Sequence, residues 1–276
     1  MPYRTILVYL NDQRRVEKML QPAICLARRY SAHLIGLHVY PGVPAPPIPL
    51  PGSKYVAGTV LASERKESDA IAAVFSEMTA NQPFVSEWRT FTAPLFEIPM
   101  LVMEHARCTD LIIAGQVDPT WDFSLMLDFP ERLALESGRP VLVVPHDGHY
   151  RELGRNAVIA WKPAREAARA TFDALPLLKD AERVQILEVK PSAGITVEQD
   201  TSIAASLGRH GIKPILQSAI KPDSRVGEEI LSRVAHEGAD LLVMGAYGHS
   251  RLREYVLGGA TRYIARHMTV PTLWSH

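Results

Sequence analysis

The sequence has few of the features that mark secreted or membrane-spanning proteins. Its 276 residues include only two cysteines, Cys25 and Cys108, which lie far apart and outside any CxxC pair, so we expect neither a structural disulfide nor a zinc site. The longest apolar runs, such as VLVV at 141–144, are too short to cross a bilayer. The opening residues, MPYRTILVYLND, do not predict a secretory signal. These absences favour a cytoplasmic protein without a membrane partner.

Net charge and catalytic motifs are also lacking. Thirty Lys and Arg residues balance thirty Asp and Glu residues, and the pI is near 7.2. No long-range field therefore attracts nucleic acid or an anionic membrane. The sequence contains no GxSxG elbow, no GxxxxGK[ST] loop and no HExxH pair. We therefore expect a binding protein rather than an enzyme.

Two halves of the sequence are related to each other. TDLIIAG matches ADLLVMG, GRPVLVVPH matches TVPTLWSH, and RTILVYL matches NAVIAWK. The last pair has a larger offset, which predicts an insertion in the first half. We place the two units at residues 1–148 and 153–276, joined by HDGHYRELGR.

The insertion falls at residues 41–60, where six prolines lie between residues 41 and 51. Such a segment predicts a surface loop or flap without regular structure, and a polyproline ligand is the alternative.

Each half alternates short β-branched runs with helical stretches. In the first half the predicted strands are 4–9, 33–40, 84–91, 110–115 and 141–144. In the second half they are 156–161, 183–189, 213–219, 240–245 and 270–274. The stretch 165–178 predicts one helix that buries Ala168, Phe172, Leu175 and Leu178. This alternation predicts an α/β fold of two tandem, doubly wound, Rossmann-like domains, each with a five-stranded parallel sheet.

The segment GAYGHSRLREYVLGG follows the apolar run DLLVM of the fourth strand in the second half. Ligands of open parallel α/β sheets bind at the carboxyl ends of the strands. Glycines there let backbone N–H groups approach an anion, and a helix that starts near Gly258 would direct its positive end to the same place. The segment therefore predicts a phosphate cradle built on Gly245, Gly248, Gly258 and Gly259.

The pattern G-x2-G-x9-G, placed after the fourth strand of such a unit, resembles the universal stress protein family. Two units in one chain resemble its tandem bacterial members, and the resemblance covers nearly all of the chain. It implies that the halves pack as a pseudo-dimer, in which the last strand, PTLWS, could pair with its equivalent.

For the ligand, the resemblance implies ATP or a related adenine nucleotide in the second half. The matching positions are Gly245 and Gly248 for ribose and phosphate, Gly258 and Gly259 for phosphate N–H contacts, and Ala160, Trp161 and Val189 for the adenine. Whether Mg²⁺ accompanies the phosphates is left open.

Two positions of the second half depart from the family pattern. The family commonly has an acidic residue at the end of its first strand, where this sequence has Lys162. An ammonium group cannot accept that hydrogen bond, but it can reach a phosphate. Gly259 stands where Ser or Thr is usual, so the hydroxyl contact is missing while the backbone N–H remains.

Basic residues cluster around the cradle, namely His249, Arg251, Arg253 and Arg262. They favour neutralisation of phosphate, with Arg251 the best candidate, or they form a solvated helix face.

The first half has lost the motif, because AGQVDPTWDFSLMLDF contains no glycine after Gly115. Asp118, Asp122 and Asp128 stand in this loop, and their charge predicts that no nucleotide binds there. A Mg²⁺ or Ca²⁺ site is the alternative. Asn11 stands near the position where an acidic residue is common. We expect a degenerate domain that pairs with the functional one.

Two smaller features each allow two interpretations. HDGH (146–149) predicts a linker, with a fragment of a metal site as the alternative. Cys108 predicts a small buried hydrophobe, with a thiol activated by Arg107 as the alternative.

These patterns lead to two functional hypotheses. The first is a cytoplasmic stress-response protein that binds an adenine nucleotide as a regulatory ligand. The second is a nucleotide-free scaffold in which both cradles have decayed and a protein partner, or a second copy of the chain, carries the function. An ATP-consuming enzyme is a third, weaker alternative.

Overall fold

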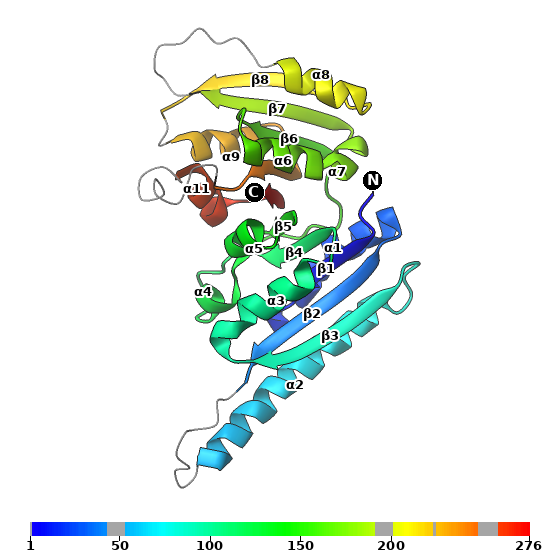
Figure 1. Cartoon of the computed structure of the whole chain (residues 1–276), viewed down its shortest axis with the longest axis vertical. Helices are drawn as coiled ribbons and strands as arrows, with labels where there is room; N and C mark the ends of the chain where they lie inside the picture. The colour runs from blue at the N-terminus through cyan, green and yellow to red at the C-terminus, as the bar shows by residue number, and fades with distance from the viewer. Residues whose placement is uncertain (1, 43–52, 191–200, 223–224, 248–258) are drawn as a thin grey trace.

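Ten strands form one continuous sheet in the order β3-β2-β1-β4-β5-β10-β9-β6-β7-β8 (Figure 1). The structure, a computed structural model, describes residues 2–42, 53–190, 201–222, 225–247 and 259–276, without the side chains of 53–61 and 125. Each half contributes five strands in the same spatial order, and the strand pairings described within each half are parallel. The predicted α/β fold of two tandem doubly wound units is confirmed.

The first half alternates strands and helices along the chain. Its strands are β1 (Thr5–Tyr9), β2 (His33–Pro41), β3 (Ser86–Ala93), β4 (Leu111–Gly115) and β5 (Val141–Val144). Its helices are α1 (Val16–Tyr30), α2 (Ser53–Thr79), α3 (Ile98–Ala106), α4 (Ser124–Leu127) and α5 (Pro130–Glu136), with 3-10 turns η1 (Gln13–Arg15) and η2 (Leu95–Glu97).

The second half repeats this arrangement. Its strands are β6 (Asn156–Trp161), β7 (Arg183–Lys190), β8 (Ile215–Ile220), β9 (Leu241–Gly245) and β10 (Thr272–Ser275). Its described helices are α6 (Arg165–Asp173), α7 (Leu175–Lys179), α8 (Thr201–Arg209), α9 (Val226–His236) and α11 (Gly259–His267). All ten strands lie within two residues of their predicted bounds, because runs that are apolar on both faces are typical of buried parallel strands.

The two halves are joined by the antiparallel pairing of β5 with β10. Leu273 lies opposite Leu142 and Trp274 lies opposite Val141. Leu142 and Leu273 are fully buried in the core layer beneath α1, α2, α6, α7 and α8, which contains residues of both halves. A second layer beneath α3, α5, α9 and α11 also spans both halves. The expected pairing of the last strand with its equivalent is thus found within one chain, and the halves form a pseudo-dimer.

The repeat extends to the amino ends of the strands. The Asp110 carboxylate accepts hydrogen bonds from the backbone N–H groups of Arg4 and Thr5, at 2.7 and 2.9 Å. The Asp240 carboxylate does the same for residues 154–156, at 3.0 to 3.1 Å. Each carboxylate holds the chain as it enters the central strand of its half, which gives both residues a structural role.

The predicted single helix over residues 165–178 is wrong. The chain forms two helices, α6 and α7, with Ala174 between them. Pro176 explains the break, because proline lacks an N–H group and its ring clashes with a preceding turn. The buried face of α6 carries Ala167, Ala170 and Thr171, whereas Phe172, which was expected to be buried, is 41% exposed.

The predicted irregular insertion at 41–60 is also corrected in part. Residues 43–52, which carry five of the six prolines, lie outside the described residues. Helix α2 already begins at Ser53, so the last part of the predicted loop is helical. Figure 1 shows α2 running along the sheet and extending beyond it at its N-terminal end.

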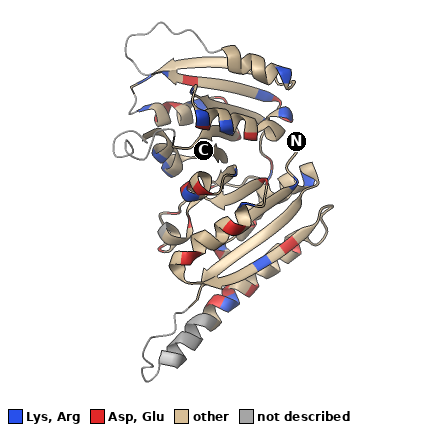
Figure 2. Ribbon diagram, viewed as in Figure 1, with Lys and Arg blue, Asp and Glu red and all other residues tan. Residues whose placement is uncertain are grey.

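The structure also shows how the charged side chains are distributed and how long and apolar its helices are. Basic and acidic side chains are spread over both halves in the view of Figure 2, and the net charge of the chain is zero. Among the described residues, the helices are all too short or too polar to serve as a membrane span.

We predict that Leu273→Ala lowers the free energy of unfolding by about 2–5 kcal/mol, because it leaves a cavity beside Leu142 in the shared core. Urea unfolding measures this loss. Ile215→Ala on the edge strand β8 is the control, since Ile215 is 45% exposed and should lose much less. Equal losses at the two positions would show that the β5–β10 pairing is not a critical part of the core.

Candidate functional site

Six of the predicted site residues lie within the described part of the second half. Ala160 and Trp161 end β6, Val189 lies near the end of β7, and Gly245 ends β9. Lys162 follows β6 and is exposed, and Gly259 begins α11. The carboxyl ends of β6, β7 and β9 are neighbours in the sheet. The remaining four residues, Gly248, His249, Arg251 and Gly258, lie outside the described residues.

Strand alternation separates the residues expected around the adenine. Ala160 and Val189 contact the core layer beneath α9 and α11. The Trp161 side chain points to the opposite face, where it is 9% exposed in the other core layer. Only Ala160 and Val189 therefore present their side chains on a common face.

Gly245 is required by close packing. A Cβ atom at this position would lie 2.6 Å from the main-chain carbon of Glu166 and 2.7 Å from the nitrogen of Ala167. The first turn of α6 thus rests directly on the end of β9. Beyond it, Tyr247 adopts a left-handed conformation with φ of 53°, so the chain turns sharply as it leaves the strand.

The matching site in the first half is filled by its own side chains. The Arg15 guanidinium lies against Gly115, where a Cβ atom would meet its Nη1 at 3.1 Å. Its Nη2 donates to Asp128 at 2.7 Å, and its Nη1 donates to the Gln116 carbonyl at 3.0 Å. Asp12 lies 3.4 Å from its Nε. Arg15 and both carboxylates are buried.

Asp128 is the centre of this network. Its carboxylate accepts hydrogen bonds from the Asn11 amide at 2.9 Å and from the Ser124 hydroxyl at 2.5 Å, in addition to that from Arg15. The Trp121 ring covers the Arg15 guanidinium at 5.2 Å. Burial raises the pKa of the neighbouring Tyr9 hydroxyl well above its ordinary value, and the Asp128 charge adds to this rise.

The structure corrects the reason given for the loss of the first site. Repulsion by the charges of Asp118, Asp122 and Asp128 was expected, but Asp128 is buried and paired with Arg15. The Asp118 carboxylate accepts hydrogen bonds from the Thr120 N–H and hydroxyl, and the Asp118 backbone N–H donates to the Ser124 hydroxyl. Within the described ranges, no group of three or more His, Cys, Asp or Glu residues is placed to hold a metal ion.

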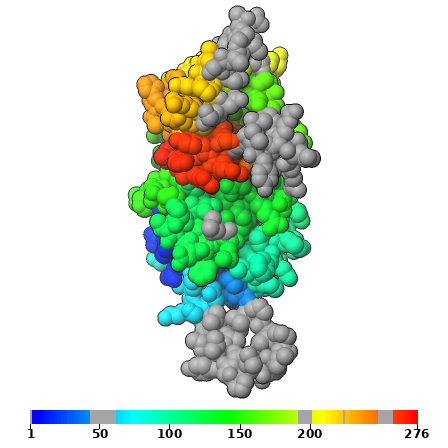
Figure 3. All heavy atoms as spheres, turned by 90° about the vertical axis from the view of Figure 1, so that its left-hand side faces the viewer, coloured from blue at the N-terminus to red at the C-terminus, as the bar shows by residue number. Residues whose placement is uncertain are grey.

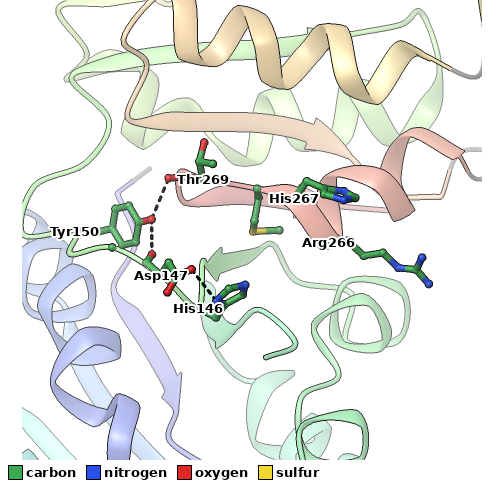
Figure 4. A pocket seen from close by; sticks show the side chains of 8 residues that line it. His146, Asp147, Tyr150, Arg266, His267 and Thr269 are labelled. Carbon is green, nitrogen blue, oxygen red and sulfur yellow. Dashed lines mark hydrogen bonds and ion pairs between the residues drawn. The ribbon is translucent and has the colours of Figure 1, made fainter. Parts of the chain in front are cut away.

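A cavity of about 350 Å³ lies where the linker between the halves meets the end of α11 (Figure 4). It is lined by His146, Asp147, Gly148, Tyr150, Arg266, His267, Met268 and Thr269. The Tyr150 hydroxyl lies 2.7 Å from the Asp147 carbonyl and 3.0 Å from that of Thr269, so it ties the linker to the second half. Burial, followed by the Asp147 charge, raises the pKa of Tyr150 to about 12, so this hydroxyl keeps its proton at neutral pH. HDGH thus forms part of the junction.

The expectation for Cys108 is wrong. The residue is exposed rather than buried, and Cys25 is half-buried.

The comparison with known families bears on the second half. Residues 160–275 match the sequence profile of the Universal stress protein family. The second half of the chain is therefore similar in sequence to the universal stress protein family. The matched range contains all the proposed site residues, which agrees with the resemblance seen in the glycine pattern.

Known universal stress proteins match the chain in sequence and in fold. One from Synechocystis is 37% identical over 81 residues, which cover 27% of this chain and only 28% of that relative's length. The structure of one from Archaeoglobus fulgidus has a TM-score of 0.72 at 14% identity and covers 98% of this chain and 95% of its own. One from Pseudomonas aeruginosa has a TM-score of 0.59 at 14% identity, with 99% and 93% covered. At such identities the structures show a shared fold, which in this chain consists of two α/β units in tandem.

The Arg15 network was missed in the sequence, although a signal for it exists. Asp118 and Asp128 follow Gly115 at the spacings at which Gly248 and Gly258 follow Gly245. In the first half, carboxylates therefore stand in place of the two glycines of the motif, and a buried carboxylate requires a cationic partner.

We predict that Asp128→Ala lowers the free energy of unfolding by about 3–5 kcal/mol, because it leaves the buried Arg15 guanidinium without its counter-charge. Thermal or urea unfolding measures the loss. Glu136→Ala is the matched control, since it breaks the more exposed pair with Arg132 and should change stability by about 0.5 kcal/mol or less. A similarly small effect of Asp128→Ala would show that the network does not hold the loop.

A second prediction compares two glycines of the motif. Gly245→Ala should cost about 1–3 kcal/mol, since its methyl group would collide with the backbone of α6. Gly259→Ala should cost nothing or stabilise by up to about 1 kcal/mol, because no atom of the described residues lies within 4 Å of the added methyl group and alanine favours helix. Unfolding curves of the two variants decide this, and equal losses would contradict the packing role of Gly245.

Proposed function

We propose that the second half binds an adenine nucleotide, ATP or a close relative, as a regulatory ligand of a cytoplasmic stress-response protein. The proposal places one ligand on each chain, because the equivalent place in the first half is filled by Arg15 and Asp128. The nucleotide class follows from the family resemblance, and the position follows from the comparison of the two halves.

The internal anion of the first half carries this proposal. There, the Asp128 carboxylate is held by Asn11 and Arg15 at the carboxyl ends of the central strands. In the second half, Gly258 has the same spacing from its strand, so the sequence supplies no carboxylate at that point. A phosphate from outside can take the place of this missing anion.

One of the residues that hold Asp128 in the first half is replaced by a positively charged residue in the second half. Ile6 pairs with Leu111 and Ala157 pairs with Leu241, so Lys162 stands in the second half where Asn11 stands in the first. Asn11 also donates to the Leu127 carbonyl at 2.7 Å, so its position faces the turn before the following helix. A lysine in this position brings a positive charge toward the site of the proposed phosphate.

The other predicted residues complete the proposed site. Ala160 and Val189 offer an apolar face for the base. Gly259 begins a nine-residue helix whose first N–H groups have no intrahelical partners. By their place in the sequence, Gly248, His249, Arg251 and Gly258 would add further contacts to ribose and phosphate.

The proposed activity is binding without turnover. An ATP hydrolase needs a group that orients water and usually a carboxylate for Mg²⁺. Asp240 lies at the amino end of β9 and is engaged with the backbone of residues 154–156. We therefore assign no catalytic residue.

A second candidate function is that of a protein-interaction scaffold. Large apolar side chains are exposed on the first half, with Phe96 at 90% and Met100 at 60%. Such side chains suit a protein partner, which agrees with a first half that has closed its own ligand site.

Equilibrium dialysis with labelled ATP tests the proposal, and we predict uptake of one nucleotide per chain. Lys162→Ala should weaken binding about tenfold or more, since hydrogen bonds to charged groups contribute about 1.5–3 kcal/mol. Lys162→Asp should weaken it further, and Gly248→Leu should abolish it. Lys179→Ala, which removes an exposed lysine at the end of α7, should leave binding unchanged.

No uptake at millimolar ATP would contradict the proposal and favour the scaffold. Tighter binding by Lys162→Asp would show that the ligand uses the acidic contact usual in the family. Steady phosphate release that disappears in Gly248→Leu would instead indicate an enzyme.

A further inference from the structure

Gln116 uses all of its polar groups in hydrogen bonds, and one of these bonds reaches the second half. It directly follows β4 and is 1% exposed. Its backbone N–H donates to the Val144 carbonyl at 2.8 Å, and its backbone carbonyl accepts from Arg15 at 3.0 Å. Its side chain accepts from the His146 N–H at 3.0 Å and donates from Nε2 to the Ala265 carbonyl at 2.8 Å. An N–H donor at one end and a carbonyl at the other fix the orientation of this amide.

The Ala265 carbonyl belongs to the last turn of α11. The last four carbonyls of a helix lack partners within the helix, and leaving such a group buried and unpaired costs about 1–3 kcal/mol. Ala265 is 8% exposed, so water reaches it poorly. The Gln116 amide therefore supplies the donor that this end of the helix needs. Figure 3 shows residues 259–276 in direct contact with the first half.

The second half has no equivalent of this side-chain contact at the matching position. Ala246 takes the place of Gln116 in the second half, because its N–H donates to the Ser275 carbonyl at 2.8 Å as that of Gln116 does to Val144. Alanine has no side-chain amide, so it cannot form the reciprocal bond to the first half. The first half therefore positions a helix of the second half without an equivalent return contact from this position.

We propose that Gln116 is a positioning residue for the ligand site of the second half. It anchors the C-terminal end of α11 to the buried network around Arg15. This anchor fixes the position of the helix and therefore the position of its N-terminal end, Gly259, relative to the nucleotide. The proposal rests on the proposed function for its ligand. The anchoring of α11 can be tested without the ligand.

Gln116→Glu is the decisive variant, because it keeps the acceptor for His146 and replaces the donor for Ala265 with an oxygen. Gln116→Met removes the donor without adding charge. Gln82→Glu is the matched control, since Gln82 Nε2 also donates to a carbonyl in the last turn of a helix, that of Met78 in α2 at 3.1 Å.

Two measurements are made on the full chain. Hydrogen exchange without nucleotide should become faster in α11 in both Gln116 variants and stay unchanged there in Gln82→Glu. Dialysis with ATP should give binding roughly three- to thirtyfold weaker in both Gln116 variants, at a temperature where unfolding curves show the proteins folded. A purely structural role would lower the unfolding midpoint and leave ATP affinity of the folded protein unchanged.

The outcomes separate the two proposals. If the wild-type protein takes up no ATP, the proposed function fails, while faster exchange in α11 still supports the anchor. Unchanged exchange in α11 overturns the inference whatever the protein binds. Wild-type ATP affinity in both Gln116 variants also overturns it.

Discussion

The antiparallel pairing of β5 with β10 constrains the whole molecule, because it joins two parallel five-stranded sheets into one and extends both core layers across the seam. Since the strands of the two halves run in opposite directions at this seam, the carboxyl edge of the first half meets the amino edge of the second. The loop after β4 thereby lies beside the end of the helix that leads into β10. The contact between Gln116 and Ala265 is a direct result of this geometry.

The two halves share a fold but have different residues at the carboxyl ends of their central strands. In the first half, a guanidinium from η1 and a carboxylate from the turn before α5 neutralise each other in the buried space beside β4. In the second half, Glu166 stands where Arg15 stands, and its chain packs on Gly245. The position that matches Asp128 is a glycine. The first edge is thus filled by its own ion pair, while the second has neither the cation nor the anion of that pair.

Much of this arrangement could be predicted from sequence, and the failures have physical causes. The strands were found because apolar runs are a local signal, and the pseudo-dimer was found because the two halves repeat. The helix over 165–178 failed because a single periodicity was assumed across Pro176, where the chain begins a new helix. The pairing of Arg15 with Asp128 joins residues 113 positions apart, and only the folded sheet brings them together. Gln116 was missed for the same reason, since its partners lie in the linker and in α11.

Under the proposed function, the two edges also differ in how their stability depends on a ligand. The Arg15–Asp128 contact is intramolecular, so its contribution does not depend on the concentration of a ligand. A site completed by an external phosphate stabilises the folded state by an amount that grows with the logarithm of ligand concentration above Kd. Helix α11 connects the ion pair of the first half to the proposed ligand site of the second half. Its C-terminal end is held by Gln116, and its first residue is Gly259. In the proposed function, a nucleotide bound to the second half would contact the start of α11, while the first half, whose own site is filled, would hold the end of this helix.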